Sequence, residues 1–217
     1  MTNTFPYEKD NLVRQPWEHY FAKYQEADPQ EIASRLSLPY DPEKKEFSLC
    51  FLGTQYQVSF PDFQVTHTSD PLAYYPLEEM IKARILTLRF LLNGNDSPGS
   101  GAFRTYREMP WGEVYLRQFD GRCIKRLAFS YGNRLETFQR VMEHAGAVRT
   151  AAGDLSYRLA IYPGYEVQMI LWEGDEEFPP SSQFLFSDNF PLSFEAEDIA
   201  QMGDVLISTL KAWEKLL

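Results

Sequence analysis

The stretch SYRLAIYPGYEVQMILWEGDEEFPPSSQFLFSD, from Ser156 to Asp188, decides the fold class of this chain. Its first part alternates polar with apolar residues from Ser156 to Ile161, the period of a strand with one buried face. YPGY then supplies a turn, and EVQMILW is apolar on both faces near its end, as a central strand is. SQFLFSD adds another short strand. Strands joined by short turns predict an antiparallel sheet.

A second hairpin is predicted upstream, in KEFSLCFLGTQYQVSFPD from Lys45 to Asp62. Apolar residues alternate with polar ones on both sides of Gly53, which is suited to the turn. The first run includes Cys50, which we expect to face the second layer of the sheet as a small buried residue. This segment therefore adds two strands to the predicted β structure.

Three later segments have the period of a helix. The apolar residues of 77–91, 135–142 and 199–213 recur every three to four positions. Gly94 fits the end of the first of these helices. Ser193 is a candidate N-cap for the last one, whose first turn carries acids favourable to the helix dipole.

The N-terminal residues 1–40 are predicted to form a helical appendage. Aromatic residues of 17–24 lie on one helical face, and Asp28 is placed to cap a second helix. Residues 41–217 then form a single α+β domain, an antiparallel sheet of about five strands with helices packed on it. The sequence thus predicts one domain with a short N-terminal helical hairpin.

The composition limits the classes of partner. The chain has 217 residues, with 31 acids against 21 bases and a formal charge of −10. Such a surface repels phosphate backbones, and the bases of 104–126 are interleaved with acids, so we expect no nucleic-acid partner. No signal peptide or apolar run of membrane-spanning length occurs, so we expect no membrane association and a cytoplasmic location. Two cysteines without a CxxC pair predict no iron–sulfur cluster.

The acids in WEGDEEF are the first candidate site. If the strand continues past Trp172, Asp175 and Glu177 point to the same side, where they could share a hard cation or divide acid and base roles. Trp172 and Phe178 flank the acids, which indicates that the acids border something apolar. The alternative interpretation is a solvated turn, in which Gly174 supplies the bend and the acids face water.

Three further residues are candidates for the same site. Asp188, at a strand end, contributes only if folding brings it near Asp175 and Glu177. Trp111 stands in a turn, where an aromatic side chain can edge a ligand pocket or pack in the core. His67, in the loop after the first hairpin, is the histidine we would test as a metal ligand or proton carrier alongside Asp175 and Glu177.

These motifs resemble a known family. WEGDEEFP is similar to a W-x-G-D-x-E-F-P element of the bacterial and archaeal domain of unknown function 3786, and FLGTQYQVSFP resembles the first hairpin of that family. The resemblance covers about residue 40 to the end. It implies a protein widespread in anaerobes with no established activity. Some relatives carry a cysteine-rich iron–sulfur segment, which this chain lacks.

Taken together, these features predict a cytoplasmic protein that binds a small molecule or a metal-containing cofactor as an accessory in anaerobic metabolism. Trp172, Asp175 and Glu177 would lie at the rim of an aromatic pocket. One alternative is an enzyme, a hydrolase or lyase that uses the acidic pair as acid and base. The other is an interaction module whose acidic surface docks on a basic partner enzyme.

Overall fold

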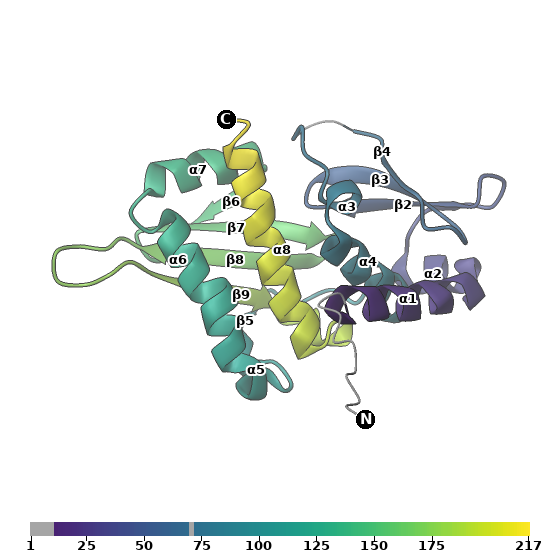
Figure 1. Ribbon diagram of the computed structural model, residues 1–217, viewed down its shortest axis with the longest axis horizontal. Helices are drawn as coiled ribbons and strands as arrows, with labels where there is room; N and C mark the ends of the chain where they lie inside the picture. Colours follow the sequence, from purple (N-terminus) through teal and green to yellow (C-terminus); the bar gives the residue numbers. More distant parts are fainter. Residues whose placement is uncertain (1–10, 70–71) are drawn as a thin grey trace, which may run out of the picture.

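The computed structural model describes residues 11–69 and 72–217, and its elements form two antiparallel sheets with helices packed on them (Figure 1). In chain order the elements are α1 (Asn11–Glu26), α2 (Pro29–Leu36), β1 (Tyr40–Asp41), β2 (Glu46–Phe51), β3 (Thr54–Ser59), β4 (Val65–His67), α3 (Pro76–Glu79), α4 (Ile81–Asn93), β5 (Phe103–Thr105), η1 (Tyr106–Glu108), α5 (Gly112–Phe119), η2 (Asp120–Ile124), α6 (Lys125–Tyr131), α7 (Leu135–His144), β6 (Val148–Thr150), β7 (Leu155–Tyr162), β8 (Tyr165–Trp172), β9 (Ser181–Ser187), η3 (Phe190–Leu192) and α8 (Ala196–Glu214). The predicted α+β class is confirmed.

The predicted strands divide between two sheets. The order of the first sheet is β1-β2-β3-β4, and that of the second is β5-β9-β8-β7-β6. The sequence predicts one antiparallel sheet that includes the upstream hairpin, whereas this hairpin forms a separate sheet, and the five-stranded sheet is completed by the short strands β5 and β6. One backbone hydrogen bond, from Leu52 N–H to the Ile161 carbonyl (3.0 Å), joins the turn of that hairpin to β7.

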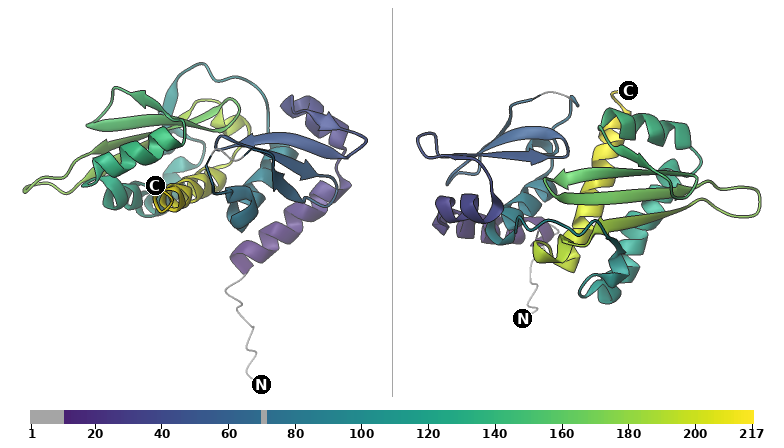
Figure 2. Two further views of the ribbon diagram at one scale, coloured as in Figure 1. Left: turned by 90° about the horizontal axis from the view of Figure 1, so that it is seen from above. Right: turned by 180° about the vertical axis from the view of Figure 1, so that it is seen from behind.

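The five-stranded sheet is covered by helices on one face. Helices α6 and α8 run across this face, and the view from behind shows the strands in front of them (Figure 2). Strand β8 lies between β7 and β9. The side chains of Val167 and of Met169 to Leu171 are buried, Gln168 is half-buried, and Trp172 at the end of the strand is exposed. A long apolar run is thus the sequence signature of the central strand.

An aromatic cluster joins α4 to the β7–β8 turn and to the segment before α8. Phe90 of α4 stacks on Tyr162, with ring centroids 4.2 Å apart, and on Phe194 at 5.7 Å. The Tyr162 hydroxyl is hydrogen-bonded to the hydroxyl of Thr87 at 2.9 Å. Complete burial raises the pKa of Tyr162, so this phenol remains neutral. The Tyr162 ring also contacts Phe51 of β2, with centroids 5.1 Å apart, so the cluster joins α4 to both sheets.

The N-terminal residues form the two predicted helices. Helix α2 begins after Asp28, whose side chain accepts a hydrogen bond from Gln30 N–H at 2.8 Å, the predicted cap. Helix α1 packs through Tyr24, which is fully buried and donates to the Ser59 carbonyl at 3.1 Å. The helical hairpin is therefore tied to the four-stranded sheet.

Two details of the helices differ from the prediction. Met80 has an extended backbone (φ −118°, ψ 108°), which divides the predicted 77–91 helix into α3 and α4. Ser193 does not cap α8, because its hydroxyl is used by Asn95 N–H at 2.8 Å. The cap is Glu195, whose N–H donates to the Asp198 carboxylate at 3.0 Å in a capping box.

We predict that replacing Phe90 with alanine lowers the free energy of unfolding by about 3–5 kcal/mol, because it removes a buried ring from the aromatic cluster. Chemical denaturation followed by circular dichroism measures this change. The matched control is Phe129→Ala on α6, where the ring is 76% exposed. Equal losses for the two variants would contradict the role assigned to the cluster.

We also predict a pH dependence from Asp198. Burial raises its pKa to about 6, although the Arg89 guanidinium opposes this. Because the pKa is higher in the folded state, the contribution to stability is present below about pH 4 and is lost as the pH rises through about 6. Between pH 4.5 and 7.5 the wild type should lose about 2 kcal/mol relative to Asp198→Asn in urea unfolding. A parallel pH profile for the two proteins would argue against this pKa.

Candidate functional site

The acidic loop between β8 and β9 is organised by Asp175. Its carboxylate accepts hydrogen bonds from the backbone N–H groups of Glu177 (2.8 Å) and Phe178 (2.7 Å). These two bonds lower the pKa of Asp175. Its own N–H donates to the Phe178 carbonyl at 2.9 Å, which closes the turn. The Asp175 carboxylate therefore has a structural task within an exposed turn.

Asp188 lies at the opposite end of β9 from this loop. Its carboxylate accepts from Ser100 N–H at 2.9 Å and from the Ser100 hydroxyl, and these bonds lower its pKa. A seven-residue strand spans about 20 Å. Asp188 therefore anchors the loop that follows α4, far from Asp175 and Glu177.

His67 and Trp111 lie in other parts of the fold. His67 is in β4 of the four-stranded sheet, where its Nδ1 is 2.8 Å from a Glu78 carboxylate oxygen and its ring stacks on Tyr75 at 3.6 Å. Trp111, 76% exposed, directly precedes α5 with a left-handed backbone (φ 63°). The fold thus does not bring His67 together with the acidic loop. Within residues 11–69 and 72–217, no group of three or more His, Cys, Asp or Glu is arranged to hold a metal ion.

The feature that sequence reasoning missed is a π-helical turn, η2, between α5 and α6. It packs on α8 through Cys123, whose thiol donates to the Ala200 carbonyl at 3.4 Å. A Cβ atom at Gly203 would lie 2.6 Å from the Cys123 sulfur, so the glycine makes room for this contact. On the other side, the Ser182 hydroxyl of β9 donates to the Ile124 carbonyl at 2.6 Å. The turn is therefore held between α8 and the sheet.

Such single π-helical turns inside α-helical segments are often found at functional sites. The sequence contains one local signal for it, Gly121 inside an otherwise helical segment. A glycine there is compatible with many kinds of helix interruption, so the signal is not specific. Burial raises the pKa of the Cys123 thiol to about 12, so it remains protonated and acts as a packing group.

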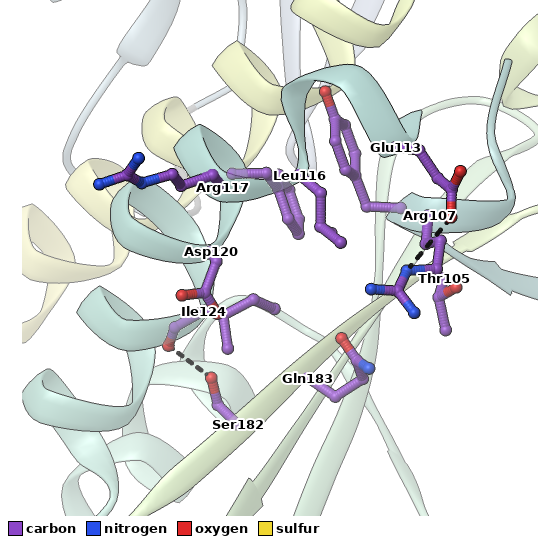
Figure 3. Close-up of a pocket in the computed structure, with 11 residues that line it drawn as sticks. Thr105, Arg107, Glu113, Leu116, Arg117, Asp120, Ile124, Ser182 and Gln183 are labelled. Atoms are coloured by element: carbon purple, nitrogen blue, oxygen red, sulfur yellow. Dashed lines mark hydrogen bonds and ion pairs between the residues drawn. The ribbon is translucent and has the colours of Figure 1, made fainter. Parts of the chain in front are cut away.

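A cavity of about 670 Å³ opens beside this turn, between η1, α5, η2 and β9; we call it the π-helix cavity (Figure 3). Its lining residues are Thr105, Tyr106, Arg107, Glu113, Leu116, Arg117, Phe119, Asp120, Ile124, Ser182 and Gln183. Figure 3 shows Gln183 and Ser182 reaching in from the strand, opposite Leu116. The cavity therefore combines apolar walls with charged and amide groups.

Stacked aromatic rings form one wall of the π-helix cavity. Tyr106 and Phe119 lie with centroids 4.0 Å apart and ring planes within 5° of parallel. The Tyr106 hydroxyl donates to the Ala196 carbonyl at 2.9 Å, and burial raises its pKa to about 12. Tyr106 therefore supplies a rigid surface and stays protonated at neutral pH.

Both signs of charge line the π-helix cavity. Arg107 and Glu113 form a loose pair, with the guanidinium Nε 4.0 Å from the carboxylate. Asp120 pairs with Lys125 at 2.9 Å. Arg117 has no ion pair with the described part of the chain. The cavity can therefore meet both a negative and a positive group of a ligand.

The sequence model for a domain of unknown function (DUF3786) matches residues 28–209, which is most of the chain. The chain belongs to the DUF3786 family. No curated protein and no solved structure gives a match. All residues that line the π-helix cavity fall within the DUF3786 segment, whereas α1 precedes it. No helix among residues 11–69 and 72–217 combines the length and the apolar character needed to cross a membrane.

We predict that Ser182→Ala lowers the free energy of unfolding by about 1 kcal/mol, because the Ile124 carbonyl loses its hydroxyl partner. Guanidinium-induced unfolding measures the change. Ser181→Ala, at the exposed neighbouring position, is the control and should change stability by less than about 0.5 kcal/mol. If both variants matched the wild type, this bond would not help to hold the π-helical turn.

Proposed function

We propose that this DUF3786 protein binds a small organic molecule in the π-helix cavity. The observation that carries the proposal is the π-helical turn, which lines a cavity of about 670 Å³ with Asp120 and Ile124. Small-molecule sites typically have volumes of roughly 300–1,000 Å³ and combine apolar walls with a few polar groups. The cavity also lies wholly within the segment that defines the family.

The lining indicates the chemistry of the ligand. Leu116 and Ile124, with the aromatic wall, suit an apolar body. The Arg107 guanidinium reaches into the cavity (Figure 3) and is only loosely paired with Glu113, so it can meet an anionic group, and a guanidinium binds carboxylates through paired hydrogen bonds. The Gln183 amide offers both a donor and an acceptor. A small amphipathic molecule with at least one acidic group fits this set.

The proposal concerns binding rather than catalysis. Tyr106 keeps its proton at neutral pH, so it does not serve as a base there. The sequence placed the candidate ligand site at Asp175 and Glu177. We propose a different location, because the Asp175 carboxylate already organises the exposed loop. Trp111 is close in sequence to the proposed site, because it directly precedes α5.

The accessory role in anaerobic metabolism and the cytoplasmic location belong to the same proposal. The first rests on the family resemblance, and the second on the composition of the chain. Purification without oxygen, followed by metal analysis, would also detect a ligand that contains a metal.

The experiment that tests the proposal compares two tryptophan substitutions on α5. Leu116→Trp fills the π-helix cavity, whereas Val114→Trp places the same ring at a position 69% exposed. Native mass spectrometry of protein purified from its host, followed by a thermal-shift screen of amphipathic organic acids, identifies a bound compound. We expect Leu116→Trp to abolish its binding and Val114→Trp to retain it. Equal binding by both variants would place the ligand elsewhere.

A further inference from the structure

A second cavity, of about 850 Å³, lies between α1, α4, η2 and the first turns of α8; we call it the cationic cleft. Its lining residues are Val13, Gln15, Pro16, His19, Tyr20, Lys82, Ile85, Arg89, Arg122, Glu197 and Gln201. None of them lines the π-helix cavity. Figure 1 shows α1 beginning near the start of α8, where these elements meet.

Three cations line the cationic cleft against a single acid. Lys82, Arg89 and Arg122 line the cleft with Glu197, and the carboxylates that pair with these cations, those of Asp198, Glu195 and Asp204, are outside the lining. Because Lys82 and Arg122 share the Asp204 carboxylate with Arg126, positive charge is in excess around Asp204 and attracts a small anion. The strongly negative surface elsewhere opposes a large polyanion such as nucleic acid.

The carboxylates that pair with these cations are not among the residues that line the cleft. Asp204 does not line the cavity, and its carboxylate is 2.7 Å from Lys82 Nζ and 3.4 Å from an Arg122 guanidinium nitrogen. Arg126 contacts the same carboxylate. Three cations thus share the Asp204 carboxylate, so N–H groups of Lys82 and Arg122 remain available to donate hydrogen bonds to a ligand.

Arg89 is positioned rigidly at the cleft. Its guanidinium lies over the Tyr20 ring at 4.8 Å and pairs with Asp198 at 2.8 Å and Glu195 at 2.9 Å. The side chain is only 12% exposed, and its buried Nε has no hydrogen-bond partner among the described residues. A positioned cation of this kind needs little further ordering to bind an anion.

Uncharged groups complete the lining. Gln15, His19 and the Tyr20 hydroxyl provide hydrogen-bonding groups from α1, whereas Val13 and Ile85 are apolar. The combination matches a compact organic molecule that carries two negative charges on a short apolar body. Carboxylates and phosphates share this recognition chemistry.

We infer that the cationic cleft is a second ligand site, which binds a small organic dianion through Lys82, Arg89 and Arg122. This site shares no lining residue with the π-helix cavity, although the π-helical turn contributes to both. Its wall from α1 lies outside the matched family segment, which starts at residue 28. The site can therefore differ between members of the family that share the other cavity.

Isothermal titration calorimetry at low ionic strength tests the inference, with succinate, glycerol phosphate and neutral succinamide as probes. We expect at least one dianion to bind and succinamide not to bind. Succinate and glycerol phosphate distinguish a dicarboxylate site from a phosphate site. Binding should weaken as sodium chloride is added, because the contacts are ionic. No binding of either dianion, or equal binding of succinamide, would overturn the inference.

Charge-matched variants locate the binding. Arg122→Gln and Lys82→Gln each remove one lining cation, and each should weaken the affinity for the dianion by about tenfold. Lys125→Gln is the control, because it changes the net charge equally, lies three residues from Arg122 and does not line the cleft. A loss as large in Lys125→Gln would show an unspecific charge effect and refute the site.

Two further readings keep this test separate from the first proposal. Circular dichroism shows whether each variant is folded. If Arg122→Gln does not fold, Lys82→Gln alone tests the site. Leu116→Trp should leave dianion binding unchanged, because Leu116 lines the other cavity. Loss of dianion binding in Leu116→Trp with intact folding would instead assign the dianion to the π-helix cavity.

Discussion

The stacked rings of Phe90 and Tyr162 hold the two sheets of this fold in one arrangement. Phe90 comes from the helix beside the four-stranded sheet, and Tyr162 ends a strand of the five-stranded sheet. Because both rings are buried, the contact combines removal of apolar surface from water with stacking. The same helix, α4, carries Lys82 and Arg89 to the cationic cleft, so the packing of these rings also sets the geometry of that cleft.

The π-helical turn links the two cavities. Asp120 and Ile124 line the π-helix cavity, Arg122 lines the cationic cleft, and Cys123 between them packs on α8. The wider turn of a π-helix directs successive side chains differently from an α-helix. Gly203 is part of this arrangement, since a side chain there would overlap the Cys123 sulfur. Four residues of this turn thus serve two candidate sites and one packing contact.

The acidic motif in the β8–β9 loop illustrates how a distinctive pattern can have a structural role. Asp175 and Glu177 are part of the resemblance to the family, yet the Asp175 carboxylate accepts backbone hydrogen bonds that close an exposed turn. A similar task falls to Asp188, which holds Ser100 at the other end of β9. In both cases the carboxylate of an aspartate fixes a loop, and the ligand role of Asp175, Glu177 and Asp188 stays a prediction.

Period, turn residues and caps are local properties of the chain, so the α+β class, the strands of 156–188, the N-cap at Asp28 and the family could be predicted from the sequence. The tertiary structure alone decided that the strands form two sheets and that Glu195, not Ser193, caps the last helix. It also decided the two cavities, whose walls come from segments far apart in the sequence. Lys82, Arg122 and Asp204 meet only through packing, and a charge pattern along the chain does not contain that proximity.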